Sequence, residues 1–374
     1  MYRNKFLFAL FVFLLSFPAV RLSAQTPAQT PQPLSSKEIV SLLYMLPRNP
    51  SMRDEIVEEI RRRGIGFPLT DGMRSLVATK SGNDSLLRRT LEEAERRRVN
   101  PTASALPSET EARELLERTR NVTLAAANAM PDFLVKQIIK RSYAYGNTGT
   151  WKQLDNLTLA VGYRANAGEE YRLLTLNGMP VPEEVRNSND YSKYAPGASS
   201  TGAEYVTSLA NLFRPEMKTE FKVVDTDVVQ GRRTIVYEYA VKDFLTLTSS
   251  GARALVGARG RIWIDRELDR VLRFEQIATD VPRDFPITGA NILVDYDWVA
   301  INERKYLLPT HSIVMLTSSN GSASIQDRND IRFRSYQKYG AELKVIDEIG
   351  EDDEAEPEPP PKPKPDKPIK PSQD

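Results

Sequence analysis

Hydrophobic and polar residues alternate along much of the chain, most clearly between residues 260 and 316. Within residues 291–301, an extended chain places two sets of residues on opposite sides: Ile292, Val294, Tyr296 and Trp298 against Asn291, Asp295 and Asp297. A period of two in β-branched and aromatic residues is typical of a strand with one buried face. We therefore predict consecutive antiparallel strands over residues 261–265, 271–278, 291–301 and 305–316.

Similar segments on both sides of this stretch predict further strands of the same sheet. They cover residues 133–142, 154–165, 169–177, 219–226, 234–242 and 330–336. Two helices accompany the strands, each introduced by a capping box, in which Ser or Thr is followed three residues later by Glu. The first is expected from Glu111 to about Met130, and the second from Thr201 to Pro215. A helix that interrupts a series of strands is expected to cover a face of the sheet.

Residues 35–99 show helical periodicity instead and predict a small all-α module. Its four helices are short, so each needs the others to bury its apolar stripe. Two of them end in arginine runs, Arg61-Arg62-Arg63 and Arg96-Arg97-Arg98. These runs either bind an anionic partner or complement the negative end of the helix dipole, and we favour the dipole.

The first 24 residues have the features of a secretory signal peptide. Arg3 and Lys5 precede an apolar run that ends at Pro18, and small residues precede a cleavage point near Ala24-Gln25. The run has about 15 residues, whereas a membrane span needs about 20. We expect an exported protein in the periplasm of a Gram-negative cell.

Three segments have the composition of linkers or tails. Residues 25–34 predict a disordered linker, residues 100–108 a second linker, and residues 350–374 a disordered tail rich in Pro, Lys and Glu. The tail either contacts an envelope protein or peptidoglycan, or it is a solvated extension without function. Between the linkers and the tail, residues 109–349 form the predicted β-rich domain.

Composition restricts the chemistry. The 51 Lys and Arg residues nearly balance the 50 Asp and Glu residues, so we expect no nucleic-acid partner. There is no cysteine and only one histidine, His311, which excludes zinc sites built on these residues. No Gly-x-Ser-x-Gly or phosphate-loop pattern is present. We expect no cofactor, no metal and no enzymatic activity.

Neighbouring carboxylates leave one catalytic alternative open. Three pairs are close in sequence: Glu169-Glu170, Asp225/Asp227 and Asp295/Asp297. Residues two apart on a strand share a face, so each aspartate pair could bind a cation or flank a glycosidic bond. On an exposed face such pairs are usually only solvated, and we rank a hydrolase last.

Several segments carry a resemblance to a known family. They are Met130-Pro131-Asp132-Phe133, Glu169-Glu170-Tyr171, Thr201-Gly202-Ala203-Glu204-Tyr205, Gly260-Arg261-Ile262-Trp263-Ile264-Asp265, Val271-Leu272-Arg273-Phe274 and Leu307-Leu308-Pro309. Over residues 110–340 the chain resembles a family of uncharacterised secreted bacterial proteins, which are similar to the periplasmic lipoprotein-carrier (outer-membrane lipoprotein-sorting) superfamily. The resemblance implies an open antiparallel half-barrel with helices on its concave face, which holds acyl chains or lipoproteins. It brings no catalytic residue.

The expected fold is thus α+β, an open half-barrel sheet with covering helices after a helical module. From the alternation, the candidates for the concave cavity are Tyr237, Tyr239, Trp263, Phe274, Tyr296 and Trp298. The candidates for a lid are Tyr205, Leu209, Leu212 and Phe213. The first functional hypothesis is a lipid- or lipoprotein-binding envelope protein. In the second, the lid residues fill the barrel permanently and the protein is an envelope scaffold.

Overall fold

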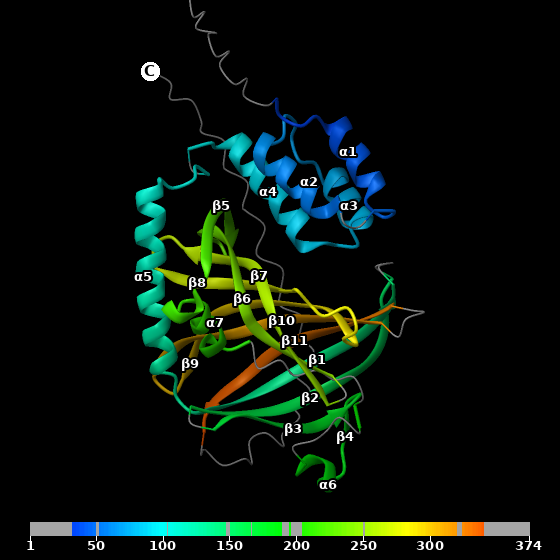
Figure 1. Cartoon of the computed structure of the whole chain (residues 1–374), viewed down its shortest axis with the longest axis vertical. Helices are drawn as coiled ribbons and strands as arrows, with labels where there is room; N and C mark the ends of the chain where they lie inside the picture. The colour runs from blue at the N-terminus through cyan, green and yellow to red at the C-terminus, as the bar shows by residue number, and fades with distance from the viewer. Residues whose placement is uncertain are drawn as a thin grey trace, which may run out of the picture.

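Figure 1 shows a computed structural model of the chain. The structure describes residues 32–49, 52–102, 104–146, 150–165, 167–188, 194–195, 204–249, 251–319 and 324–339. The predicted signal peptide, most of the linker over residues 25–34 and the tail over residues 350–374 lie outside the described residues.

Most of the described chain belongs to one large antiparallel sheet of eleven strands. They are β1 (Phe133–Tyr145), β2 (Lys152–Arg164), β3 (Gly168–Leu176), β4 (Met179–Pro180), β5 (Glu220–Val229), β6 (Arg232–Ser249), β7 (Ala252–Asp265), β8 (Arg270–Thr279), β9 (Ile287–Ile301), β10 (Arg304–Ser319) and β11 (Ser324–Lys338). Their order is β4-β3-β2-β1-β11-β10-β9-β8-β7-β6-β5. Since β4 and β5 form the two edges, the sheet is not closed, consistent with an open α+β half-barrel (Figure 1).

The described residues also contain seven α-helices. They are α1 (Ser36–Met45), α2 (Met52–Arg63), α3 (Asp71–Lys80), α4 (Ser85–Val99), α5 (Glu109–Asn128), α6 (Glu183–Arg186) and α7 (Val206–Leu212). The helices α1 to α4 gather at one end of the molecule, and α5 runs along the side of the sheet (Figure 1). The Ser108 hydroxyl caps α5 by accepting the N–H of Glu111 at 3.2 Å. The Tyr237 hydroxyl on β6 donates to the Ala112 carbonyl of α5 at 2.7 Å, which ties this helix to the sheet.

The helix α7 begins later than its sequence suggests. A capping box at Thr201 predicts a start there, whereas the helix begins at Val206 with Tyr205 as its N-cap. Residues 201–203 lie outside the described residues. Tyr205 has no side-chain capping bond to the helix. Its ring is buried against Phe133 at a centroid distance of 5.5 Å, so packing decides where this helix starts.

The strand β7 is nine residues longer at its start than expected, because it begins at Ala252. Glycines at 257 and 260 make the first half of this strand resemble a loop. Gly260 is instead a point of close approach: a Cβ there would lie 1.9 Å from the Glu275 carbonyl oxygen and 2.9 Å from the Tyr239 hydroxyl. Only glycine leaves room for the Tyr239 hydroxyl to donate to that carbonyl, at 3.0 Å.

The helices α1 to α4 have a hydrophobic core of their own, separate from that of the sheet. At the start of this unit, Ser35 and Glu38 form a complete capping box. Leu34 was expected in the disordered linker, but it is buried and forms a parallel bridge with Ile65. An apolar residue just before the helix gains more from this core than from water, so the ordered unit includes at least one residue before the predicted start at residue 35.

Candidate functional site

The concave face of the sheet carries most of the aromatic residues that the alternation singles out. Tyr237, Tyr239, Phe274 and Tyr296 are all at most 3% exposed and belong to the large core beneath α5 and α7. Tyr239 and Phe274 stack at a centroid distance of 6.0 Å. Four of the six cavity candidates therefore lie together on one face of strands β6, β8 and β9.

The other two candidates do not face this interior. Trp263 lies on the opposite face of β7, because Ile262 and Ile264 on either side of it belong to the interior core. The strand is buried on both faces, so its sequence is apolar on both sides and alternation does not identify the inner one.

Trp298 is 42% exposed, which corrects its assignment to the cavity. The register between β8 and β9 ends at the pair Arg273 and Asp295. Beyond this point β9 changes phase, and Val299 and Ile301 pack on the interior core in place of Trp298. Loss of one neighbouring strand removes the constraint that keeps alternate residues inward.

The predicted lid fills the concave face in this structure. Tyr205, Leu209, Leu212 and Phe213 are each 1% exposed and belong to the same core as the cavity candidates. Phe213 stacks on Phe221 of β5 with ring centroids 5.5 Å apart. Two cavities of about 280 and 340 Å³ lie elsewhere, in the helical module beside Leu91 and at the β5–β6 turn beside Gly231.

Several buried polar groups lie among these apolar side chains. Some are satisfied internally, such as the Tyr336 hydroxyl, which donates to the Pro309 carbonyl at 2.7 Å. Four others are buried without a hydrogen-bond partner: Thr119 Oγ1, Gln276 Nε2, Tyr296 Oη and Ser312 Oγ. The alternation of polar and apolar residues does not identify Gln276 or Ser312 as inward-facing, because it assigns polar residues to the outer face of the sheet.

The outer face of the sheet has a different character, because arginines of the helical module contact carboxylates of β5 there. Arg61 Nε and Arg97 Nη2 donate to the two carboxylate oxygens of Asp225 at 3.1 and 2.6 Å. Burial raises the pKa of Asp225, and the charges of Arg61 and Arg97 partly offset this effect. A buried carboxylate on one unit is thus held by two cations of the other.

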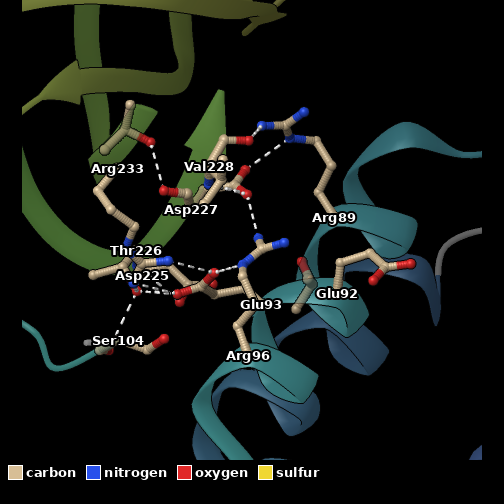
Figure 2. Close-up of polar contacts among 12 residues, drawn as sticks. Arg89, Glu92, Glu93, Arg96, Ser104, Asp225, Thr226, Asp227, Val228 and Arg233 are labelled. Atoms are coloured by element: carbon tan, nitrogen blue, oxygen red, sulfur yellow. Dashed lines mark hydrogen bonds and ion pairs between the residues drawn. The ribbon is translucent and has the colours of Figure 1, made fainter. Parts of the chain in front are cut away.

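Asp227 is the second such centre (Figure 2). Its carboxylate accepts from Arg89 Nε at 2.7 Å, Arg96 Nη2 at 2.9 Å and Trp263 Nε1 at 3.0 Å. Arg89 also donates to the Val228 carbonyl at 2.9 Å. The indole N–H explains why Trp263 faces outward, since it has a buried partner there.

In a third ion pair of this contact the charges are reversed: Glu93 of α4 supplies the carboxylate, and the sheet supplies the arginine (Figure 2). Arg233 of β6 donates to it at 3.0 and 3.2 Å, and Thr226 and Arg96 donate as well. Burial opposes ionisation of Glu93, but these hydrogen bonds outweigh it and lower its pKa. Alternating charges from both sides make the contact specific in register.

The arginine runs therefore have a role that neither sequence alternative described. Arg61, Arg96 and Arg97 bind carboxylates of the same chain across this contact. Arg62 and Arg98 pair with Glu59 and Glu95 three residues earlier on their own helices. The sequence could not reveal the first set, because its partners are more than 120 residues away.

His311 lies on the outer face between two carboxylates. Its Nε2 is 2.9 Å from Asp330 Oδ1, and its Nδ1 is 3.6 Å from Asp295 Oδ2. Hydrogen bonds to Asp295 and Asp330 raise the pKa of His311 to about 9. Burial opposes ionisation of Asp295, but His311 and Arg273 lower its pKa to about 2. The imidazolium is thus a fixed cation that joins three strands.

A hydrolase needs two carboxylates that are free to act on a substrate, whereas most carboxylates of the predicted pairs bind other side chains of this protein. Asp225 and Asp227 bind arginines, and Asp295 binds Arg273 at 2.5 Å and lies beside His311. Asp297 is exposed and accepts the N–H of Trp298. Glu169 accepts the Tyr171 hydroxyl at 2.6 Å, and burial raises the pKa of Glu169. Within the described residues, no three His, Cys, Asp or Glu side chains are grouped to hold a metal ion.

The described part of the chain contains no helix with the length and apolar character needed to cross a membrane. The predicted leader is not among these residues.

Comparison with known proteins gives remote structural likenesses only. No family model and no curated protein matches the chain, so its resemblance to the lipoprotein-carrier superfamily stays a prediction. A DUF1329 family protein from Desulfovibrio piger is 12% identical, with 63% of this chain and 95% of that chain covered and a TM-score of 0.29. The Mycobacterium tuberculosis lipoprotein LppX is 13% identical, with 59% and 94% covered and a TM-score of 0.20. The Pseudomonas aeruginosa MucA/MucB complex is 9% identical, with 58% of this chain and 94% of that chain covered and a TM-score of 0.17.

Proposed function

We propose that this protein is an exported, non-enzymatic binding protein of the cell envelope, which takes an acyl chain of a lipid or lipoprotein against its concave face. The observation that supports this most is the seating of α7. This seven-residue helix rests on the concave face through side chains that are almost wholly apolar. An acyl chain offers the same kind of contact, and each buried methylene contributes about 0.8 kcal/mol.

The size of α7 is compatible with displacement. Its anchors include Leu209, Leu212 and Phe213, each 1% exposed. Fully burying side chains of this kind is worth about 1.5–3 kcal/mol each. About six to eleven buried methylenes of a guest would match that contribution, so exchange between helix and lipid is close to balanced. In this proposal α7 occupies the interior when no ligand is present.

The proposal is tested by native mass spectrometry of the full-length protein recovered from the periplasm. Binding predicts adducts with the masses of lipids or acylated peptides, and their consistent absence would contradict it. A fluorescent acyl-chain probe added to delipidated protein gives a second readout. Leu209→Ala loosens the helix and should strengthen probe binding. Leu87→Ala is the matched control, because Leu87 is equally buried but lies in the core of the helical module.

A second candidate function is an envelope scaffold in which α7 is a permanent part of the core. The near-complete burial of Tyr205 and Phe213 favours it, as does the ionic contact that fixes the helical module. A scaffold predicts no lipid adducts, and it predicts envelope partners in crosslinking that are lost when residues 350–374 are removed. Unchanged partner recovery after that truncation would argue against a role of the tail.

A carboxylate-based hydrolase remains the least supported alternative. The exposed Asp297 and the ion-paired Asp295 are its best remaining pair. If an activity is found on a polymeric substrate, Asp295→Asn together with Asp297→Asn should abolish it. Activity that survives the double substitution would exclude this pair as its source.

A further inference from the structure

The interior contains polar groups whose hydrogen-bonding capacity is not used within the chain. Gln276 is 2% exposed, and Tyr296 and Ser312 are fully buried. The side-chain amide nitrogen of Gln276 and the two hydroxyl oxygens have no hydrogen-bond partner. Native proteins rarely bury such groups unsatisfied, because each one loses its bonds to water on folding.

The three groups belong to one small region of the concave face. Ser312 on β10 is directly opposite Val294 on β9, and Gln276 on β8 is directly opposite Ile292. Tyr296 lies two residues beyond Val294 and points to the same core. Gln276 is at a diagonal position to Val294, about 7–8 Å away, so all three residues are neighbours of Val294 on this face.

A fourth group approaches from the helical side. Thr119 of α5 is fully buried, and its hydroxyl also has no partner. It lies four residues after Leu115, on the helix face that contributes to the interior core. Helix and sheet thus each present polar groups within an otherwise apolar interior.

We propose that these groups bind an uncharged hydrogen-bond acceptor, the carbonyl of an ester or amide, at the head of an acyl ligand. This inference rests on the proposed function and adds the chemistry of the ligand's polar end. An amide N–H and three hydroxyls can all donate to a carbonyl oxygen or to the ester oxygen beside it. The acyl chain then lies along the aromatic and aliphatic residues on which α7 rests.

The surroundings disfavour a free fatty acid. Glu204 is a buried carboxyl group next to the lid, and its charge adds to the effect of burial in raising the pKa of Tyr296. Arg141 is a buried arginine on the same face, but Asp155 holds it through both carboxylate oxygens at 2.6 and 2.5 Å. A ligand carboxylate would meet an acidic side chain, and the buried Arg141 on this face is already paired with Asp155.

The experiment compares three C18 probes on delipidated full-length protein at pH 8: 1-monooleoylglycerol, oleate and 1-octadecene. We expect 1-monooleoylglycerol to bind at least tenfold more tightly than either of the others. Binding of 1-octadecene or oleate with equal affinity would overturn this inference while leaving the proposed function intact. Failure of all three probes to bind would overturn both.

Substitutions that remove the polar atom but keep the shape test the residues themselves. Ser312→Ala, Gln276→Met and Tyr296→Phe should each weaken 1-monooleoylglycerol binding about three- to tenfold and leave 1-octadecene binding unchanged. Because each also removes an unsatisfied buried group, the ligand-free protein should keep or raise its Tm.

Tyr336→Phe is the matched control beside the same core. The Tyr336 hydroxyl already donates to the Pro309 carbonyl at 2.7 Å, so its loss should lower the Tm without changing the preference among the three probes. If the three test variants also lower the Tm and leave the probe preference unchanged, their polar atoms serve the folded chain alone and the inference fails.

Discussion

The two faces of the sheet are covered by different kinds of contact. The concave face is closed by apolar packing, in which α7 is held by Leu209, Leu212 and Phe213. The outer face near β5 is closed by charges, in which Asp225 and Asp227 are held by arginines of the helical module. Apolar contacts are non-directional, whereas paired buried charges permit essentially one arrangement.

This difference suggests that a ligand can displace α7 from the concave face but cannot displace the helical module from the outer face. A guest with no shape requirement beyond being apolar can replace a helix on the concave face. An apolar guest cannot replace the module. If the module moved away, the buried carboxylates of Asp225 and Asp227 would lose their arginine partners. We therefore expect the helical module to stay in place under conditions that release α7.

The largest effect should come from breaking the ionic cover. Asp227→Ala leaves Arg89 and Arg96 without their shared carboxylate in a largely buried contact. We expect a loss of about 3–5 kcal/mol in the free energy of unfolding, measured by urea denaturation. Asp297→Ala, on an exposed strand position, is the control and should change it by less than about 0.5 kcal/mol. Equal effects at both positions would remove the contrast between the two covers.

The apolar cover should respond less strongly. Leu209→Ala removes a fully buried side chain and should cost about 2–4 kcal/mol in urea denaturation of delipidated protein. Saturating acyl ligand should reduce that loss, because the ligand fills the space left by the side chain. A loss that is the same with and without ligand would indicate that α7 is a permanent part of the core.

Gly260 allows β7 to approach the Glu275 carbonyl of β8 closely, beside the Tyr239 hydroxyl. Gly260→Ala places a Cβ against the Glu275 carbonyl and should cost about 1–3 kcal/mol. Gly289→Ala is the control, because a Cβ there meets its nearest atom at an ordinary 3.6 Å. A neutral result at Gly260 would show that β7 and β8 can separate without loss.

The smallest effect concerns His311 and is visible as a pH dependence. Its pKa of about 9 in the folded state exceeds the ordinary value of 6.5, so its contribution is fully present below pH 6.5 and is lost as the pH rises through 9. The ring is partly exposed, and screening reduces the contribution to about 1–2 kcal/mol. The difference in unfolding free energy between wild type and His311→Gln should shrink between pH 6.5 and 9.5. A constant difference would contradict the role of its charge.

Several features of the fold were accessible from the sequence because they depend on local pattern. The alternation in residues 291–301 correctly predicts β9 and places Val294 and Tyr296 inward. Trp298 fails for a tertiary reason, since β9 leaves β8 just before it. Trp263 fails because outward-facing side chains of neighbouring strands, among them Val236 and Leu272, form a second apolar cluster around it, so β7 is buried on both faces.

The segment after residue 180 shows the same limit. Its polar composition predicts an irregular stretch over residues 180–197, but Glu183–Arg186 form the short helix α6. Val181 and Val185 are buried and give this helix its place on the sheet. A helix of four residues is too short to produce a recognisable period, so only its packing reveals it.

Most strands, the helical unit and the apolar character of one sheet face could be predicted from the sequence, because these features follow from the order of neighbouring residues. The tertiary structure alone decided which carboxylates meet which arginines, since Arg96 and Asp227 are 131 residues apart. It also decided that α7 occupies the concave face and that Gln276, Tyr296 and Ser312 come together there. Contacts between residues so far apart in sequence depend on strand register and on packing of the folded chain, which a local sequence pattern does not predict.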